Sequence, residues 1–343
     1  MSSPSPARRR FRFRTPPSAG APGFRPSLVP GGAGGAGDPP GAGGGAAGAG
    51  RPDESTVGAL VRLVRPRQWL KNVLVFGAPA AAGVLSHRRD LLDSAAAFVV
   101  FCLAASGTYC VNDVVDRQAD RLHPAKRFRP VASGKVSVPT ALALGVTLLA
   151  ASIGLCLAIG RPKVVVVVLA YVATTVAYSI WLKHEAVVDL GAVAAGFVLR
   201  AIAGGVATAV PLSNWFLIVA CFGSLFMVTG KREAEIQALG DLGGGHRATL
   251  DTYTPSFLRY VRSVSSGVAM TAYCLWAFEK AHGASGAIWF ELSIVPFVLG
   301  VLRYGLLVDA GKGGAPEEVV LGDRTLQILG AALGLLFALG VYG

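Results

Sequence analysis

Long runs of apolar residues alternate with short polar segments from about residue 68 to the end of the chain. Most of these runs approach about 20 residues, the length at which an α-helix crosses the hydrocarbon core of a bilayer. Breaker segments such as Gly160-Arg161-Pro162 separate neighbouring runs. The pattern therefore predicts nine transmembrane helices, at approximately residues 68–86, 93–111, 139–159, 163–182, 186–206, 212–230, 257–280, 286–305 and 322–342.

The connections between these predicted helices differ in length and in charge. The long connections, residues 112–138, 231–256 and 306–321, all fall on one side of the membrane. With the N-terminus inside, the opposite side holds only five basic residues, Arg88, Arg89, Arg161, Lys163 and Lys280. Because lysine and arginine concentrate on cytoplasmic loops, we predict a multi-pass protein of the plasma (inner) membrane. Its N-terminus and its long loops are expected in the cytoplasm.

Composition agrees with this class. Hydrophobic residues make up 52% of the chain and charged residues only 15%, whereas soluble globular proteins carry about 25% charged residues. The cysteines lie in apolar stretches without metal-ligand spacing, which indicates buried free thiols. They are Cys102, Cys110, Cys156, Cys221 and Cys274. The predicted fold class is an all-α polytopic membrane protein.

Residues 1–55 differ from the rest of the chain. Five arginines between Arg8 and Arg14 precede a tract rich in Gly, Ala and Pro that reaches Gly50. Such a segment buries too little apolar surface to fold, and it lacks the apolar region of a signal peptide. We predict a disordered tail, followed by a catalytic transmembrane domain at 56–343. The arginines suit solvent or anionic headgroups, and no folded nucleic-acid-binding module accompanies them.

Acidic residues follow directly on the apolar run at 98–111. Asp113, Asp116 and Asp120 fall within roughly 60° of one another on a helix, with Asn112 beside them. Carboxylates are unfavourable at a helix C-terminus and costly at membrane depth, so they mark function. We predict that these residues hold one or two Mg²⁺ ions on a phosphorylated substrate. Asp113 and Asp120 are about 10 Å apart along a helix axis, so either diphosphate bridges two ions or the helix breaks before Asp120.

Basic residues follow this acidic motif within ten positions: Lys126, Arg127 and Arg129. Magnesium usually takes one or two carboxylates together with substrate phosphates, and arginines bind the remaining phosphate oxygens as bidentate donors. We predict that these three residues bind donor phosphates. The alternative is a loop in which aspartates and arginines pair with each other. Pairing explains the basic residues but leaves the one-sided acidic stripe unexplained.

Other polar residues on the same predicted face are further candidates for substrate binding. Tyr178 and Lys183 border the turn after the fourth predicted helix, and Arg247 lies before the seventh. Arg200 lies within the fifth helix, where it should bind an anion or carbonyl groups, or pair with an internal carboxylate. Arg67 and Lys71 flank Trp69. This arrangement suits either a lipid phosphate at headgroup level or ordinary interfacial anchoring.

These motifs resemble a known family. The spacing of Asn112, Asp113, Asp116 and Asp120, followed by the basic residues and Gly134, is similar to the first aspartate-rich motif of the UbiA superfamily of intramembrane prenyltransferases. The nine spans and Tyr178 with Lys183 fit the same fold. Aromatic prenyltransferases of this superfamily carry a second Asp-x-x-x-Asp motif after the sixth span. Here that stretch reads Lys231-Arg232-Glu233-Ala234-Glu235, which argues against donor binding through two metal clusters.

A closer resemblance is to one branch, the decaprenyl-phosphate phosphoribosyltransferases of mycobacteria and their relatives. The matching segments include Arg65-Pro66-x-Gln68-Trp69-x-Lys71-Asn72, Lys126-Arg127-Phe128-Arg129-Pro130, Tyr178-Ser179-x-x-Leu182-Lys183-His184 and Leu199-Arg200-Ala201. The resemblance implies a Mg²⁺-dependent transferase that moves 5-phosphoribose from phosphoribosyl diphosphate to a polyprenyl phosphate and releases diphosphate. It also implies a role in making arabinan precursors of the cell wall.

Two rival functions remain at this level. A UbiA-type enzyme that joins a prenyl diphosphate to an aromatic or other acceptor would use the same metal chemistry. A transporter of an anionic solute would also place charge near the membrane midplane, but its charges should line a path open to both sides. Here they gather on one face. The residues leave the polyprenyl chain length and a homo-oligomeric state open.

Overall fold

The computed structural model describes residues 55–123, 126–240, 252–282, 286–313 and 316–343. The tail predicted at 1–55 lies almost wholly outside the described residues and stays a prediction. The candidate Arg247 also lies outside them.

The described residues are helical and contain no strand, which confirms the predicted all-α class. In chain order the elements are α1 (Thr56–Val64), η1 (Pro66–Phe76), α2 (Gly77–Ala81), η2 (Val84–Ser86), α3 (Arg88–Val115), α4 (Arg117–Leu122), η3 (Lys126–Phe128), α5 (Val138–Ala158), α6 (Pro162–Ile180), η4 (Leu182–His184), α7 (Val188–Ala207), α8 (Asn214–Gly240), α10 (Pro255–Ala281), α11 (Ala287–Leu307), η5 (Val308–Lys312), α12 (Pro316–Gly322) and α13 (Arg324–Tyr342).

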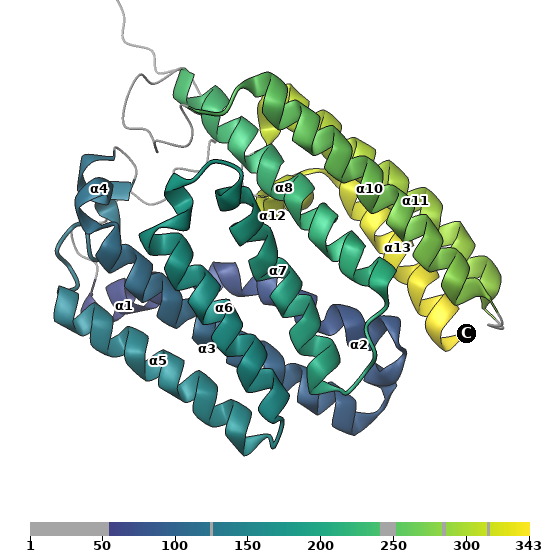
Figure 1. Ribbon diagram of the computed structural model, residues 1–343, viewed down its shortest axis with the longest axis horizontal. Coiled ribbons are helices and arrows are strands. Elements are labelled where there is room, and N and C mark those ends of the chain that lie inside the picture. Colours follow the sequence, from purple (N-terminus) through teal and green to yellow (C-terminus); the bar gives the residue numbers. More distant parts are fainter. Residues whose placement is uncertain (1–54, 124–125, 241–251, 283–285, 314–315) are drawn as a thin grey trace, which may run out of the picture. The chain divides into compact units, whose positions relative to one another are not determined.

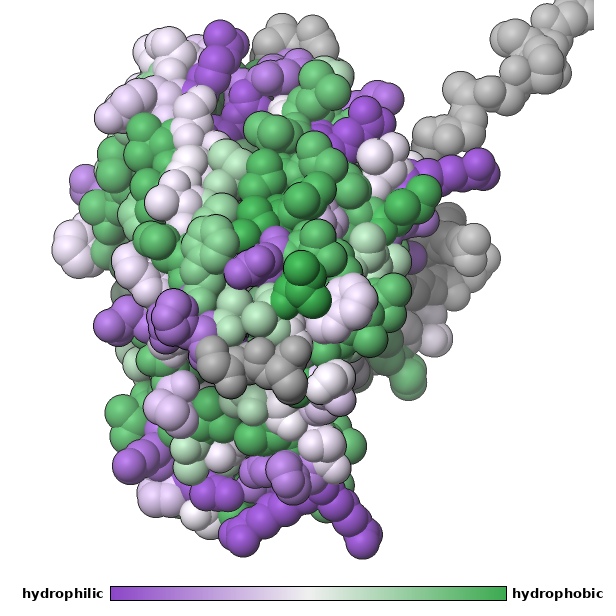
Figure 2. All heavy atoms as spheres, turned by 90° about the vertical axis from the view of Figure 1, so that its right-hand side faces the viewer, coloured by the Kyte–Doolittle hydropathy of each residue, from purple (hydrophilic) through white to green (hydrophobic). Residues whose placement is uncertain are grey.

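Seven of these helices are long and apolar enough to cross a membrane: α3, α5, α6, α7, α8, α11 and α13. Their bounds reproduce seven of the predicted spans to within a few residues, apart from the longer ends of α3 and α8. α10 has the bounds predicted for an eighth span, although it is not among the seven most apolar. Apolar side chains such as Val166 and Ile328 remain more than half exposed, as expected of a lipid-facing surface. Hydrophobic side chains cover much of the face in Figure 2, and hydrophilic ones gather mainly along its upper and lower edges.

The first predicted span, 68–86, is not one α-helix, and that part of the prediction is wrong. The chain instead forms the 3-10 segment η1, the short helix α2 and the 3-10 turn η2. Pro66 lies at the start of η1, directly after Arg65 in a left-handed conformation (φ 53°). Gly83 (φ 72°) separates α2 from η2. Proline and left-handed residues interrupt a regular helix, so this region follows the surface of its neighbours.

Close contact with two long helices fixes this irregular segment. η1 packs against both α3 and α7, and the Trp69 indole donates a hydrogen bond to Ser106 Oγ of α3 at 3.0 Å. On the α7 side, a Cβ added to Gly204 would lie 1.7 Å from the Val75 carbonyl oxygen. Only glycine allows the backbone to approach this closely. These contacts hold η1 against both α3 and α7.

The buried side chains form several clusters, which join the helices whose arrangement Figure 1 shows. One cluster joins α3, α6 and α7 through residues such as Phe101, Val168 and Ala203. Another joins α10 and α11, with partly buried residues of α8 and α13 around Trp276 and Phe290. Helices α3 and α5 meet at Gly107 and Gly145, where small residues permit close packing. These contacts fix α3, α6, α7 and α8 against their neighbours.

We expect Gly204→Ala to destabilise the protein, because its Cβ would overlap the backbone of η1. Overpacking of this kind costs about 1–3 kcal/mol. Gly223→Ala in α8 is the matched control, since a Cβ there has no heavy atom within 4 Å and alanine favours a helix by roughly 0.5–1 kcal/mol. Thermal unfolding midpoints in detergent measure both effects. Equal midpoints for the two variants would contradict the close contact.

Candidate functional site

A cavity of about 360 Å³ lies among η1, α3, α6, α7 and α8. Among the described residues its lining includes seven cationic side chains, Arg65, Lys71, Lys126, Arg129, Arg200, Lys231 and Arg232. Two carboxylates, Asp116 and Glu235, line it as well. A cavity with this excess of positive charge suits a ligand that carries several negative charges. Most of the substrate-binding candidates of the sequence therefore meet at one place.

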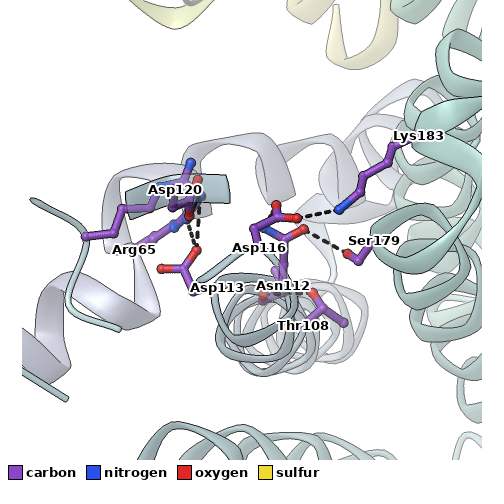
Figure 3. A network of polar contacts seen from close by, with 10 residues as sticks. Arg65, Thr108, Asn112, Asp113, Asp116, Asp120, Ser179 and Lys183 are labelled. Atoms are coloured by element: carbon purple, nitrogen blue, oxygen red, sulfur yellow. Dashed lines mark hydrogen bonds and ion pairs between the residues drawn. The ribbon is translucent and has the colours of Figure 1, made fainter. Parts of the chain in front are cut away.

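The acidic motif does not continue on one helix. α3 ends at Val115, Asp116 follows as its cap (φ −84°, ψ 0°), and α4 begins at Arg117. Of the two arrangements expected from the 10 Å spacing, the structure shows the break before Asp120. The break separates the carboxylates into two groups, which Figure 3 shows on different sides of the end of α3.

Asp113 and Asp120 form the first group, and neither lines the cavity. Their side chains are buried, and Arg129 Nη1 lies 2.7 Å from Asp120 Oδ2 and 3.4 Å from Asp113 Oδ1. Arg65 donates a further hydrogen bond to Asp113. Two arginines thus neutralise two carboxylates, which is the pairing that the sequence offered as the alternative. This cluster fixes the junction of α3 and α4 against α1 and the loop before α5.

Asp116 and Asn112 form the second group, at the cavity wall. Asp116 accepts a hydrogen bond from Lys183, and its Oδ2 accepts another from Asn112 Nδ2 at 3.1 Å. Asn112 Oδ1 in turn accepts a hydrogen bond from Ser179 Oγ of α6 at 2.9 Å. Figure 3 shows Ser179 of α6 and Lys183 of η4 reaching this group. The group presents carboxylate and amide oxygens to the cavity.

The fit of a divalent metal rests on this second group. The described residues contain no group of three or more His, Cys, Asp or Glu side chains that could hold a metal ion together. Asp116 and Asn112 nevertheless offer hard oxygen ligands beside cationic side chains. Because Mg²⁺ commonly takes one or two carboxylates together with substrate phosphates and waters, these residues fit an ion shared with a phosphate ester. The assignment of metal to the four motif residues stays a prediction.

The basic residues predicted to bind substrate fall into two sets, those at the cavity and those away from it. Lys71, Lys126, Arg129 and Arg200 line it, as does Tyr178, and Lys183 contacts Asp116 at its wall. Arg67 and Arg127 are exposed, and neither lines the cavity. The Arg127 guanidinium lies 4.8 Å from the centre of the Phe128 ring. Their roles in substrate binding stay predictions.

Arg200 lies inside the membrane helix α7 and lines the cavity. It is 5% exposed, and it lies twelve residues, or about 18 Å, beyond the start of α7. Its guanidinium donates to Asn72 Oδ1 (2.7 Å), the Gly196 carbonyl (2.6 Å) and Tyr171 Oη (3.0 Å). No carboxylate pairs with it in the described part of the chain. The positive charge is therefore solvated by dipoles and remains available to an anion.

A network of buried polar side chains at the end of α8 was not predicted from the sequence. Arg232 is buried and donates to Glu235 Oε2 (2.6 Å), Tyr178 Oη (3.0 Å) and Asp189 Oδ2 (3.3 Å). Tyr253 also donates to Asp189, and burial together with this bond raises the pKa of Tyr253. Tyr253 therefore stays neutral and donating at physiological pH. The alternation of basic and acidic residues at 231–235 was the available signal, but the partners Asp189 and Tyr253 are remote in sequence.

Comparisons with known proteins agree with this geometry. The profile of the UbiA prenyltransferase family matches residues 73–341. Decaprenyl-phosphate phosphoribosyltransferase of Corynebacterium glutamicum is 44% identical over 296 residues, covering 85% of this chain and 89% of that protein. The enzyme of the same name from Mycobacterium tuberculosis H37Rv is 47% identical over 290 residues, with coverage of 82% and 94%.

Solved structures share the fold. A UbiA homologue from Archaeoglobus fulgidus bound to GPP and Mg²⁺ superposes with a TM-score of 0.64 at 18% identity, covering 82% of this chain and 98% of that one. The same homologue bound to Cd²⁺ gives a TM-score of 0.62. Digeranylgeranylglyceryl phosphate synthase gives 0.58 at 18% identity, with coverage of 83% and 98%. At this level of identity the likeness concerns the fold.

The two groups of carboxylates should respond differently to substitution. Asp113→Asn leaves two partly buried arginines with reduced compensation, and we expect a loss of about 1–3 kcal/mol in the free energy of unfolding. Asp116→Asn lies at the cavity wall and keeps an oxygen for Lys183, so its loss should be smaller. Unfolding midpoints in detergent at pH 7.5 compare the variants. A larger loss for Asp116→Asn would contradict this division.

Proposed function

Because the chain belongs to the UbiA prenyltransferase family, we propose that it is a decaprenyl-phosphate phosphoribosyltransferase of the membrane. It transfers 5-phosphoribose from phosphoribosyl diphosphate to a polyprenyl phosphate and releases diphosphate. The two relatives that carry this name are 44% and 47% identical over more than four fifths of the chain. The product suits the synthesis of arabinan precursors for the cell wall.

The cavity's charge is the observation that carries this proposal. Seven cationic side chains line one cavity together with two carboxylates, and three further carboxylates, Asp113, Asp120 and Asp189, balance only part of this charge from behind the wall. The proposed donor carries a diphosphate and a phosphate monoester, and the acceptor carries another monoester. A prenyl diphosphate with an uncharged acceptor would bring only the diphosphate. The excess of cations therefore favours the phosphoribosyl donor and the lipid phosphate as the substrate pair.

We assign the donor diphosphate to the wall formed by Asp116 and Asn112. A divalent ion held there, which we propose to be Mg²⁺, would neutralise the diphosphate as it leaves. Lys126 and Arg129 line the same cavity and donate to the remaining phosphate oxygens. Arg129 bonds Asp113 and Asp120 through Nη1, so it would reach the phosphate through its other N–H groups. Lys183 neutralises Asp116 in this structure, so it is placed to pass from the carboxylate to a phosphate when the donor binds. Asp113 and Asp120 remain proposed metal ligands. To bind the ion, each would have to give up its ion pair with an arginine.

The acceptor is assigned to the opposite part of the cavity. Lys71 lies on η1, and Arg200 lies twelve residues beyond the start of α7, where its guanidinium has no carboxylate partner among the described residues. An anionic headgroup bound between them would leave its polyprenyl chain among the apolar helices. The lipid phosphate is already an anion, so attack on the sugar carbon needs no general base. No histidine among the described residues lines the cavity.

Charge development at the sugar carbon follows from this arrangement. As the diphosphate leaves, the carbon gains oxocarbenium character, and the phosphate oxygens held by Lys126 and Arg129 take up the negative charge. Attack by the lipid phosphate from the opposite side inverts the configuration at the carbon.

The basic residues of the long loops indicate which side of the membrane the site faces. We place the cavity, the N-terminus and the soluble donor in the cytoplasm. Arg67, Arg127 and Arg247 stay further candidates for substrate contacts, and the oligomeric state stays open.

Asp116→Asn should lower phosphoribosyl transfer by at least about 100-fold, because the diphosphate loses its metal-binding carboxylate. The assay supplies membranes with labelled phosphoribosyl diphosphate and a polyprenyl phosphate. Asp93→Asn is the matched control, since Asp93 pairs with Arg161 (2.7 Å) at the other end of the same helix. Its activity should stay within about twofold of wild type.

A parallel incubation separates the rival function. Wild-type membranes supplied with a labelled prenyl diphosphate and an aromatic acceptor should give no labelled product. Undiminished turnover in Asp116→Asn would refute the metal-binding assignment. Prenyl transfer without phosphoribosyl transfer would refute the proposed function and favour a prenyltransferase.

A further inference from the structure

The cytoplasmic end of α8 brings three charged residues to the cavity wall: Lys231, Arg232 and Glu235. None of them is needed to hold the leaving diphosphate or the lipid phosphate as assigned above. α8 packs mainly against α7 and α10, whereas Asp116 closes α3. The α8 residues and the Asp116 group therefore line different walls of the same cavity.

Arg232 is not available to a ligand, because its guanidinium is already engaged. It is 5% exposed and donates to Glu235, Tyr178 and Asp189. Two carboxylates balance its charge. Its role is to hold Glu235 and Tyr178 in place at the cavity wall.

Lys231 differs from Arg232 both in its exposure and in its hydrogen-bond partners. Its side chain is 47% exposed, and its ammonium lies 3.9 Å from Glu235 Oε1, which is too far for a hydrogen bond. Glu235 is fixed by Arg232 through a 2.6 Å hydrogen bond. The carboxylate therefore attracts the ammonium toward the cavity without occupying its donors. A lysine in this position presents a point charge with three hydrogen-bond donors, which suits a phosphate monoester.

The chemistry of the donor requires such a group. Phosphoribosyl diphosphate carries its diphosphate on carbon 1 of the sugar and its monoester on carbon 5, so the two anions point away from each other. With the diphosphate at Asp116, Lys126 and Arg129, the monoester needs a cation on another wall. We propose that Lys231 binds the 5-phosphate of the donor and that the Arg232–Glu235 pair positions it. This assignment rests on the proposed function and identifies the end of α8 as the element that selects a phosphorylated sugar.

The proposal predicts separate effects on two inhibitors of phosphoribosyl transfer. Ribose 5-phosphate carries only the monoester, and inorganic diphosphate carries only the leaving group. In Lys231→Met the inhibition constant for ribose 5-phosphate should rise about tenfold, as expected for a lost hydrogen bond between charged groups. The constant for inorganic diphosphate should change by less than about twofold. The KM for phosphoribosyl diphosphate should rise more than kcat falls.

Two further variants control for charge and for folding. Lys231→Arg keeps a cation with several donors and should recover most of the affinity for ribose 5-phosphate. Lys312→Met removes an exposed lysine at the end of η5 that does not line the cavity, and both inhibition constants should match wild type. Each variant is assayed in membranes with the full chain.

The outcomes distinguish a failure of the proposed function from a failure of the Lys231 assignment alone. If wild-type membranes show no transfer from phosphoribosyl diphosphate, the proposed function fails, and this assignment fails with it. If wild type is active but is not inhibited by ribose 5-phosphate, or if Lys231→Met changes both inhibition constants equally or neither, only the assignment of Lys231 is overturned. A selective loss of ribose 5-phosphate inhibition supports it.

Discussion

Positive charge held inside a bundle of apolar helices is the constraint on which the rest of this structure depends. Charged groups at membrane depth are costly unless they are paired or hydrogen-bonded. The protein supplies carboxylates for some of its cations: Arg65 and Arg129 pair with Asp113, and Lys183 pairs with Asp116. Among the described residues, Arg200 receives dipolar and aromatic partners but no carboxylate. The cavity therefore retains an excess of positive charge that anionic substrates would balance.

The same constraint explains why the acidic motif is divided. Asp113 and Asp120 form ion pairs with arginines and so hold the α3–α4 junction, while the helix break turns Asp116 toward the cavity. At the end of α8, Arg232 uses Asp189 and Glu235 in a comparable way, and leaves Lys231 beside the cavity. In both places a buried ion pair acts as a support for a more exposed polar group. We infer that these buried ion pairs are already formed before the substrate binds. The bound anionic substrate then balances the remaining positive charge of the cavity.

The sequence predicted the membrane helices well because hydrophobic runs of fixed length are a local signal. It failed at 68–86, where Pro66 and the close approach of η1 to Gly204 break the helix, since that contact joins segments far apart in the chain. The motif aspartates were identified from spacing, but their partners were not. Arg65 lies 48 residues from Asp113, and Lys183 lies 67 residues from Asp116. Such long-range contacts decide which carboxylate supports the fold and which faces the cavity. Helical periodicity does not predict them.

The most direct test of this account is a mass spectrum of the lipid formed by the purified protein from phosphoribosyl diphosphate and decaprenyl phosphate in the presence of Mg²⁺. The account predicts a new lipid whose mass exceeds that of decaprenyl phosphate by one phosphoribosyl group, together with free diphosphate. It also predicts that a chelator of divalent ions abolishes both products. An unchanged lipid, or a product that forms equally well with the chelator present, would contradict the claim that this cationic cavity joins a phosphorylated sugar to a lipid phosphate.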